Sequence, residues 1–514
     1  MKTKLILQEP SLIEQIRHGI ERETLRADTD GNLSLTEHPK KLGSKLTHTY
    51  ITTDYSESLL EFITGVHSST NSLMEELTKL HCYTQAHIGN EVLWPYSMPT
   101  ALPTNDEIPL AYYGESNVGK LKTLYRKGLG LRYGRAMQTI AGLHYNFSLS
   151  NDFWTLLKNE TNDDRPLQKI KDDYYFRMIR NFHRYKWILI YLFGASPVVH
   201  ESFLEDREHS LERLNQNDFW TPKGISLRMG GLGYTSSAQS QIKLCYDELD
   251  TYIKTLEEAR LTPFKDYEEI GLKNGNEYLQ LNSHLLQIDN EFYSTVRPKN
   301  ISRTRESALM ALHYRGVEYI EVRLLDIDPF SSIGISKDRI HFLHMFLIWC
   351  LESESPAFNK TSWEESKYNF DQMVLKGRDK DLNLKKDGES ILAKDYIGKV
   401  LNEISVYTNA FSSFESKYSI SMDQQMRKWE DLEKIPSNQF LANYRGQNYL
   451  KSGMQLAKQY QADYRRHMSE CQFDEFEKLA SDTWKDQAEV EKRDRLSFDD
   501  FLKEYFDQIK IFRG

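Results

Sequence analysis

Polar and apolar residues alternate along several short segments of the first 330 residues, which is the pattern of half-buried β-strands. Two clear examples are "LHYNFSLS" (143–150) and "VEYIEVRLLDI" (317–327). In the second segment Glu321 and Arg323 share one face, while the opposite face is wholly aliphatic. Both segments are therefore predicted to be strands with one face packed in a core.

The same alternation marks "GIERETLR" (19–26), which leads into Asp30-Gly31-Asn32, a typical hairpin turn signal. We expect residues 19–27 and 33–36 to pair as antiparallel strands. Residues 47–65 are rich in β-branched and aromatic residues and predict further strands.

Helical periodicity predicts helices at about 70–92, 168–195, 243–259 and 337–353. The charged run 374–389 separates this mixed front from a helical back, 391–514, in which 498–512 carries an apolar stripe that should pack on the body. Strands and helices follow one another without a βαβαβ rhythm. This order predicts an α+β fold with a largely antiparallel sheet, as one large domain (1–514) with the helical part 391–514 packed on it.

Acidic residues recur on the polar faces of the predicted strands. Glu21 and Glu23 are neighbours on one face, and the same counting places Glu57 and Glu61 on one face with Asp54 just upstream. A like-charged pair at 4 Å costs about 4 kcal/mol at an effective dielectric constant of about 20. For one segment alone, a solvated face with exposed ion pairs is the simpler interpretation. Its repetition favours a divalent cation, and oxygen ligands without cysteine favour Mg²⁺ or Mn²⁺ at a site for nucleotide phosphate.

Other functional classes are disfavoured. The net charge of −9 and pI near 6.0 argue against nucleic acid as the main partner. "GESNVGKL" (114–121) lacks the Ser or Thr of a P-loop, and "DTDGN" (28–32) fits a hairpin tip better than a calcium loop. The four cysteines form no CxxC pair. The apolar run at the N-terminus is too short for a signal peptide core, and the longest apolar stretch, 187–199, is too short for a membrane span. The chain is expected to be cytoplasmic.

Seven blocks of the sequence, in order between about 15 and 350, resemble bacterial glutamate–cysteine ligase, also called γ-glutamylcysteine synthetase. The C-terminal third resembles it only loosely. The blocks are "GIERETLR", "LTHTYITTDYSESLLEFIT", "TLYRKGLGLRYG", "MQTIAGLHYNFSL", "YLFGASP", "LQIDNEFYSTVRPKN" and "GVEYIEVRLLDIDPF".

The resemblance implies a catalytic domain similar to that of glutamine synthetase, in which a curved antiparallel sheet forms a funnel for ATP and Mg²⁺, with Mn²⁺ as an alternative. Arg323 looks like the residue that steadies the transferring phosphoryl group. On spacing alone His144 is better interpreted as a hydrogen-bonded strand histidine; the resemblance reverses that preference. The implied metal ligands are Glu21, Glu23, Asp54, Glu61, His144 and Glu321.

The resemblance also implies two groups of substrate-binding residues. Those that match the cysteine pocket are Tyr55, Tyr125, Leu129, Gln138 and Tyr234. Those that match positions near substrate carboxylates and phosphate are Arg126, Arg228 and Tyr293.

The implied reaction joins the γ-carboxylate of glutamate to the amine of cysteine at the expense of ATP, by way of a γ-glutamyl phosphate; it is the first step of glutathione synthesis. The substrates would be glutamate, cysteine and ATP, with no nucleic-acid or membrane partner, and the family's bacterial branch suggests a monomer. Two alternatives stay open: a related carboxylate–amine ligase or guanidino kinase acting on another amine, and a non-catalytic relative that binds an amino acid or nucleotide.

Overall fold

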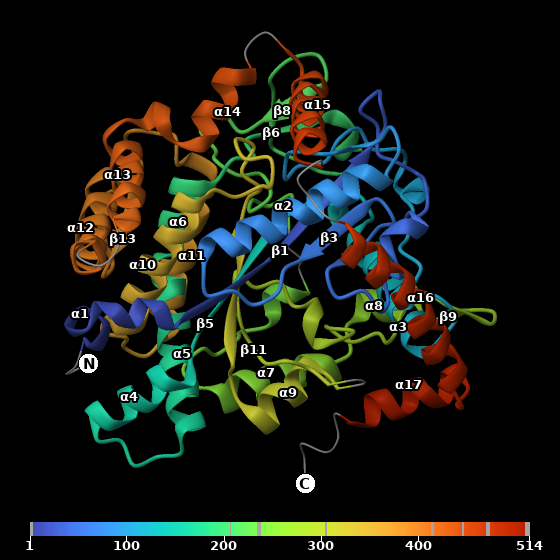
Figure 1. Ribbon diagram of the computed structural model, residues 1–514, viewed down its shortest axis with the longest axis horizontal. Coiled ribbons are helices and arrows are strands. Elements are labelled where there is room, and N and C mark those ends of the chain that lie inside the picture. Colours follow the sequence, from blue (N-terminus) through green and yellow to red (C-terminus); the bar gives the residue numbers. More distant parts are fainter. Residues whose placement is uncertain are drawn as a thin grey trace.

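The computed structural model describes residues 4–205, 207–233, 238–303, 306–412, 416–444, 447–468 and 473–508 (Figure 1). A main sheet of seven strands lies at its centre. Those strands are β1 (Ile16–Ala27), β2 (Ile51–Thr53), β3 (Leu59–Ile63), β4 (Val92–Leu93), β5 (Leu143–Leu149), β11 (Val296–Lys299) and β12 (Tyr319–Leu325). The shorter strands are β6 (Val198–His200), β7 (Glu212–Arg213), β8 (Asp218–Trp220), β9 (Lys273–Asn274), β10 (Glu277–Tyr278), β13 (Asn383–Lys386) and β14 (Glu389–Leu392).

Helices surround the sheet over the whole described chain. They are α1 (Leu5–Gln8), α2 (Thr70–His87), α3 (Asn117–Tyr133), α4 (Asn151–Thr161), α5 (Leu167–Tyr185), α6 (Trp187–Phe193), α7 (Leu249–Leu261), α8 (Lys265–Ile270), α9 (Ala308–Arg315), α10 (Lys337–Glu352), α11 (Lys360–Lys376), α12 (Ala393–Ser412), α13 (Lys417–Glu430), α14 (Pro436–Tyr444), α15 (Tyr449–Met468), α16 (Asp474–Arg493) and α17 (Phe498–Asp507).

The main sheet has the strand order β11-β12-β5-β1-β3-β2, with β4 paired to the end of β1. Every pairing in it is antiparallel. The expectation of a mixed helix and sheet fold with antiparallel pairing is therefore confirmed. No described helix combines the length and apolar character needed to cross a membrane.

The predicted strands appear with changed ends. Residues 143–150 and 317–327 form β5 and β12, and the N-terminal strand begins earlier, at Ile16. The segment 33–36 pairs only through an isolated bridge between Ala27 and Leu33, after a turn in which the Asp28 carboxylate accepts two backbone N–H bonds. Residues 47–65 divide into β2 and β3, because 54–58 form the turn between them.

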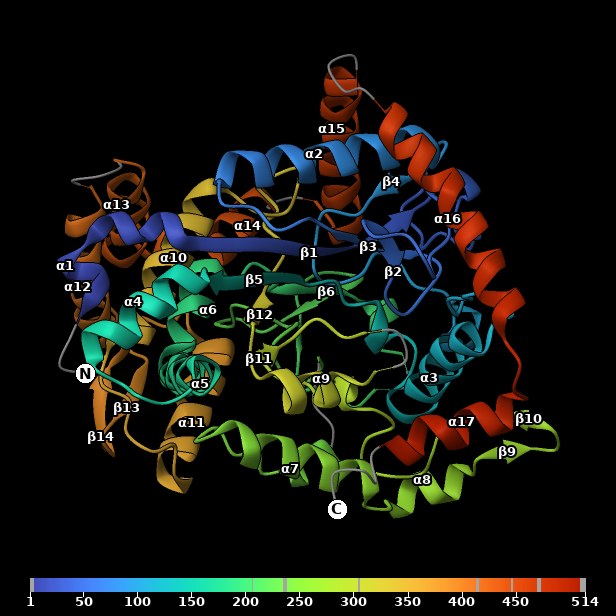
Figure 2. The same ribbon diagram turned by 60° about the horizontal axis from the view of Figure 1, so that its bottom comes forward.

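Two other predicted segments are divided differently in the structure. The region 168–195 is interrupted at Lys186, where α5 ends and α6 begins, and the charged run 374–389 holds the first strand of the β13–β14 hairpin. α17 packs through Phe501 and Leu502 against Leu121 and Leu124 of α3. Figure 2 shows α16 running along the edge of the molecule to α17, so the C-terminal helices reach both sides of the sheet.

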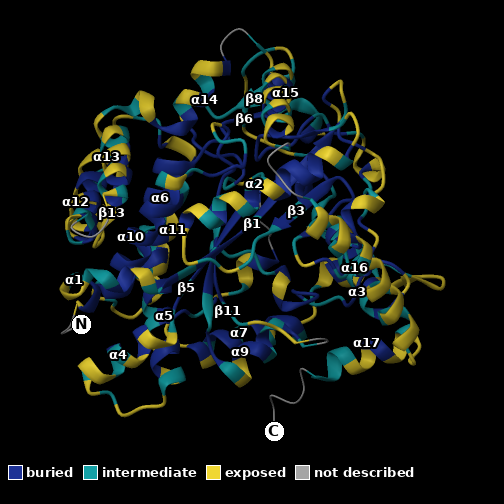
Figure 3. Cartoon of the chain, in the orientation of Figure 1, coloured by how far each residue is buried: buried dark blue, intermediate teal, exposed yellow. Residues whose placement is uncertain are grey.

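The two faces of the sheet meet different surroundings. α2 and α15 lie over one face of β1 in Figure 2, and α3, α9 and α17 lie on the other side. Buried residues concentrate in the sheet and in α6 and α10, whereas the outer faces of α12, α13 and α16 are exposed (Figure 3). The helix-covered face is aliphatic and aromatic in β5 and β12, but in β1 it also buries His18, Arg22 and Arg26.

Candidate active site

Strand register brings acidic residues from distant segments together on the less covered face of the sheet. Glu23 on β1 is directly opposite Glu61 on β3, and Glu21 is opposite His144 on β5. Glu321 on β12 is opposite Asn146 on β5. Because alternate strand residues share a face, the four carboxylates and His144 point to one region.

The side chains converge on the His144 ring. His144 Nδ1 lies 3.3 Å from Glu21 Oε2 and 3.7 Å from Glu321 Oε1, and His144 Nε2 lies 3.6 Å from Glu23 Oε1. One ligand atom each from Glu21, Glu61 and His144 lies within 4.8 Å of the other two, as a shared metal ion requires. Of the six predicted ligands, Glu21, Glu61 and His144 thus lie close enough together to share one ion.

Burial and mutual repulsion set the charge of this cluster. They raise the pKa of Glu61 well above its usual value, because the group is buried and faces Glu21, Asp54 and Glu23. Burial also raises the pKa of Glu23, against the opposing effect of His144. Carboxylates that resist ionisation next to one another are stabilised as anions by a cation placed between them.

Glu321 lies at the basic end of the cluster. Its Oε1 is 3.0 Å from Arg323 Nη1, and its Oε2 is 3.9 Å from Lys299 Nζ. Burial opposes ionisation of Glu321, but Arg323, Lys299 and His144 outweigh it and hold its pKa well below the usual value. Glu321 Oε2 is buried and accepts no hydrogen bond from the described residues, so one acceptor faces the site unused.

The donor set fits a hard divalent cation. Glu21, Glu61 and His144 offer carboxylate oxygens and one imidazole nitrogen, without sulfur. Such donors suit Mg²⁺ or Mn²⁺ rather than a structural zinc ion.

The turn between β2 and β3 carries Asp54 and Tyr55. Arg126 on α3 donates from Nε to the Asp54 carbonyl oxygen, and the Tyr113 hydroxyl donates to the carbonyls of Thr53 at 2.6 Å and Asp54 at 3.2 Å. The Arg126 guanidinium also lies over the Tyr113 ring, 4.5 Å from its centroid. Tyr113 and Arg126 therefore both donate to the Asp54 carbonyl, directly before Tyr55.

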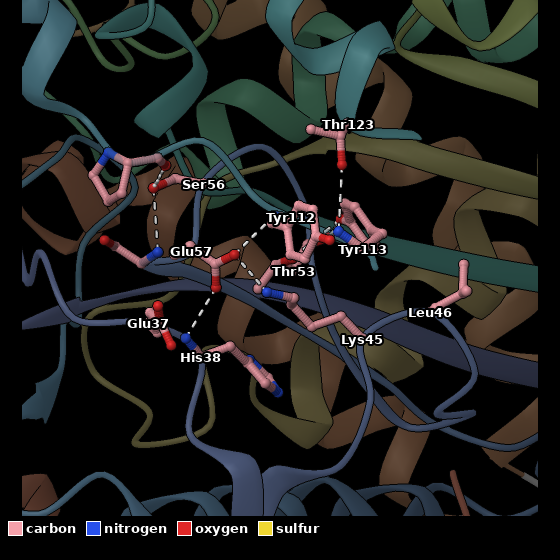
Figure 4. A network of polar contacts seen from close by, with 12 residues as sticks. Glu37, His38, Lys45, Leu46, Thr53, Ser56, Glu57, Tyr112, Tyr113 and Thr123 are labelled. Atoms are coloured by element: carbon pink, nitrogen blue, oxygen red, sulfur yellow. Dashed lines mark hydrogen bonds and ion pairs between the residues drawn. The ribbon is translucent and has the colours of Figure 1, made fainter. Parts of the chain in front are cut away.

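Glu57 fixes this turn from its other end, although the sequence pattern placed it beside Glu61. Its carboxylate accepts from the backbone N of His38 at 2.9 Å and of Tyr112 at 2.7 Å, and it pairs with Lys45 at 2.5 Å (Figure 4). Glu57 precedes β3, so strand alternation does not apply to it. The expectation that it shares a face with Glu61 is wrong, because three separate segments converge on it instead.

Tyr55 packs against helix α3. Its ring approaches Gly130 so closely that a Cβ there would lie 2.3 Å from the Tyr55 hydroxyl oxygen. The hydroxyl is buried and has no hydrogen-bond partner among the described residues. Only glycine allows this approach, and the contact brings the predicted pocket residue Tyr55 to the helix that carries Tyr125 and Leu129.

The remaining predicted substrate residues occupy neighbouring positions. Gln138 Nε2 is 3.1 Å from the Tyr293 hydroxyl, and Arg228 Nη2 donates to the Arg323 carbonyl at 2.8 Å. Tyr125 packs beside the cluster of α3 and α17 side chains, and Leu129 is buried. Tyr234 lies outside the described residues.

A cavity of about 310 Å³ opens beside the acidic cluster. Its inner end includes His144, Arg228 and Arg323. Its other end includes His183, Tyr246 and Phe358, whose rings lie with centroids 4.1 to 6.3 Å apart. Neither this aromatic end nor Lys186, which also lines the cavity, was predicted from the sequence, because no local motif joins residues so far apart.

An acidic site suited to divalent cations, next to a cavity lined by basic and aromatic side chains, has the features of an enzyme active site. The family model described as glutamate–cysteine ligase matches residues 4–373. The chain belongs to the glutamate–cysteine ligase family.

Relatives of known name agree over nearly the whole length. The chain is 43% identical to glutamate–cysteine ligase of Alcanivorax borkumensis, covering 96% of this chain and 95% of the relative. It is 40% identical to the enzyme of Hahella chejuensis, covering 98% of both. The match extends beyond residue 373, so the C-terminal helices belong to the shared protein.

Two solved structures resemble the fold. The crystal structure of glutamate–cysteine ligase from Francisella tularensis in complex with AMP has a TM-score of 0.90 at 35% identity, covering 96% of this chain and 98% of that one. A bifunctional glutathione synthetase from Pasteurella multocida has a TM-score of 0.71 at 25% identity, covering 90% of this chain and 55% of that one.

Proposed function

We propose that this chain ligates the γ-carboxylate of L-glutamate to the amine of L-cysteine, with ATP as the co-substrate and γ-glutamyl phosphate as the intermediate. The observation that carries the proposal is the convergence of Glu21, Glu61 and His144 beside Arg323, at the inner end of a cavity, in a member of the glutamate–cysteine ligase family. The product, γ-glutamylcysteine, is the first product of glutathione synthesis.

The sheet would act as a funnel of the glutamine synthetase type, with its polar face as the inner wall. Mg²⁺, or Mn²⁺, would be held by Glu21, Glu23, Asp54, Glu61, His144 and Glu321, and when bound it supplies charge neutralisation for the nucleotide phosphates. The raised pKa of Glu61 and the unused Oε2 of Glu321 support this assignment.

The cavity would hold ATP with the base at its aromatic end and the phosphates toward Arg323. The AMP complex of the Francisella relative supports an adenine nucleotide as the ligand. Glu321 fixes the Arg323 guanidinium at 3.0 Å, and the guanidinium lies in the cavity wall. In that position it would stabilise negative charge on the γ-phosphoryl oxygens as they transfer.

The amino acids would bind on the α3 side of the acidic cluster. Arg126, Arg228 and Tyr293 would bind substrate carboxylates and phosphate, and the cysteine side chain would lie among Tyr55, Tyr125, Leu129, Gln138 and Tyr234. The contacts of Arg126 with the Asp54 carbonyl and of Gln138 with Tyr293 support a continuous site.

The reaction would proceed in two steps. A γ-carboxylate oxygen of glutamate attacks the γ-phosphorus of ATP and the bond to the bridging oxygen of ADP breaks. The neutral amine of cysteine then attacks the acyl carbon, the C–O bond to phosphate breaks, and the amine loses its proton. Phosphate is needed because a free carboxylate is a poor acyl donor at neutral pH. Positioning and charge stabilisation carry the first step.

The test is phosphate release from ATP that depends on both glutamate and cysteine, measured with Glu321→Gln and with Glu389→Gln on the exposed β14 strand as the control. Glu321→Gln should lower turnover about 10²- to 10³-fold, the size of effect typical of a lost charge-stabilising group, and Glu389→Gln should leave it unchanged. Turnover of Glu321→Gln within a few fold of the wild type would contradict the metal assignment.

Replacing cysteine with other amines distinguishes this function from that of a related ligase or kinase. Phosphate release with another amine and none with cysteine would favour the related enzyme. We also propose that the enzyme is a cytoplasmic monomer, and sedimentation of the purified chain tests its oligomeric state.

A further inference from the structure

Lys186 lies where α5 ends and α6 begins, and its side chain reaches the cavity beside the acidic cluster. Its backbone N–H bonds to the Phe182 carbonyl at 2.7 Å, which fixes the residue at the helix junction. Nζ lies 3.4 Å from His183 Nδ1 and 3.4 Å from Thr295 Oγ1, and 4.7 Å from the centre of the Phe370 ring. The ammonium group is thus held by weak contacts only.

Lys186 forms no ion pair with any carboxylate of the described residues. Lys367 lines the same cavity but pairs with Asp371 one helical turn further along α11. Burial lowers the pKa of Lys186 to about 8, against the attraction of Asp371. A partly buried ammonium without a counter-charge is stabilised when an anion enters the cavity.

Thr295 places Lys186 close to the phosphoryl-handling end. The Thr295 carbonyl accepts from the backbone N of Arg323 at 2.9 Å, and the Thr295 hydroxyl contacts Lys186 Nζ. Lys186 therefore lies between Arg323 and the ring of His183 at the aromatic end. A nucleotide lying along the cavity would carry its phosphates past the ammonium group.

We propose that Lys186 binds the polyphosphate chain of the nucleotide beyond its α-phosphate, and so favours ATP and ADP over AMP. This inference rests on the proposed function, because it requires a nucleotide in this cavity. A charge-assisted hydrogen bond of this kind contributes about 1.5–3 kcal/mol, which corresponds to about 10- to 160-fold in affinity.

The test is calorimetric binding of ATP, ADP and AMP, with Mg²⁺ and without amino acids, to the wild type, Lys186→Met, Lys186→Arg and Lys169→Met. We expect Lys186→Met to weaken ATP and ADP binding at least 10-fold while AMP binding stays within about twofold. Lys186→Arg should restore ATP affinity to within about threefold. Lys169→Met, an exposed lysine of α5 outside the cavity lining, is the control and should bind all three nucleotides like the wild type.

Two results would overturn the inference while leaving the proposed function intact: unchanged ATP affinity in Lys186→Met, or an equal loss for ATP and AMP, which indicates a general disturbance of the cavity. A wild-type protein that binds no nucleotide would overturn both. Thermal unfolding of each variant shows whether a loss of binding reflects a loss of folding.

Discussion

The two faces of strand β1 bury charged residues in opposite ways. On the helix-covered face, Arg26 is almost fully buried and its guanidinium is neutralised by Glu91 at 2.6 Å, with further bonds to Thr36. On the other face, Glu21 and Glu23 gather with Glu61 around a single imidazole. The Arg26 charge is thus paired within the protein, whereas the clustered carboxylates on the other face share one imidazole.

The difference separates structural charges from functional ones. A buried ion pair with satisfied hydrogen bonds holds segments together, whereas a group of like charges lowers stability unless a ligand arrives. Removing a paired charge from the helix-covered face should therefore lower stability and leave activity nearly unchanged. Removing a carboxylate from the acidic cluster should lower activity and leave stability unchanged or raised.

The largest expected effect comes from Glu61→Gln. It removes one carboxylate from the acidic cluster, so turnover should fall about 10²- to 10³-fold. Without divalent cations, the melting temperature should stay the same or rise, because repulsion with Glu21, Asp54 and Glu23 is relieved. Calorimetric titration with Mn²⁺ should show weakened binding. A variant that melts earlier and binds Mn²⁺ normally would show that Glu61 has a structural role.

Arg26→Met tests the other face. It leaves Glu91 without its cation in a largely buried place, which should destabilise the protein by about 3 kcal/mol. The midpoint of urea unfolding should fall accordingly. Turnover of the folded fraction should stay within a few fold, because Arg26 points away from the acidic cluster. A loss of turnover with an unchanged unfolding midpoint would contradict the comparison.

Period-two alternation was enough to predict the polar face, because it assigns Glu21, Glu23, His144 and Glu321 to one side of their strands whatever the strand order. It could not predict that Arg26 is buried, since its partner Glu91 lies 65 residues away. Lys186 was missed because the helical pattern of the sequence continues without a break through residue 186. In the structure α5 ends there, and the Lys186 side chain lines the cavity.

Glu352 shows that a raised carboxyl pKa alone does not mark a functional site. It ends α10 and accepts a hydrogen bond from the backbone N of Ile6 at 2.7 Å. Burial raises its pKa to about 7 from a usual 4.5. Among the described residues, the side chains grouped closely enough to hold a metal ion do not include Glu352.

The resulting pH dependence has a definite sign. Because the folded-state pKa is raised, the stability linked to Glu352 is fully present below about pH 4.5 and is lost as pH rises through about 7. Glu352→Gln removes this dependence, so at pH 8 the variant should be more stable by about 3 kcal/mol, and near pH 4.5 it should match the wild type. Urea unfolding at several pH values measures the difference, and a gap that does not change with pH would refute the assignment.

The smallest expected effect concerns the turn between β2 and β3, which carries Asp54 and Tyr55. Tyr113→Phe keeps the ring beneath Arg126 but removes the hydroxyl that bonds to the Thr53 and Asp54 carbonyls. The turn carrying Asp54 and Tyr55 should loosen, with a loss of about 1 kcal/mol, or roughly fivefold in kcat/KM for cysteine.

Tyr112→Phe is the matched control for this change. The Tyr112 hydroxyl bonds to Glu115 at the surface, while its backbone N–H to Glu57 is untouched by the substitution. Kinetics of Tyr112→Phe should therefore equal those of the wild type. If both variants lose activity equally, the effect does not pass through the Asp54 carbonyl, and the turn is held by Glu57 and Arg126 without help from Tyr113.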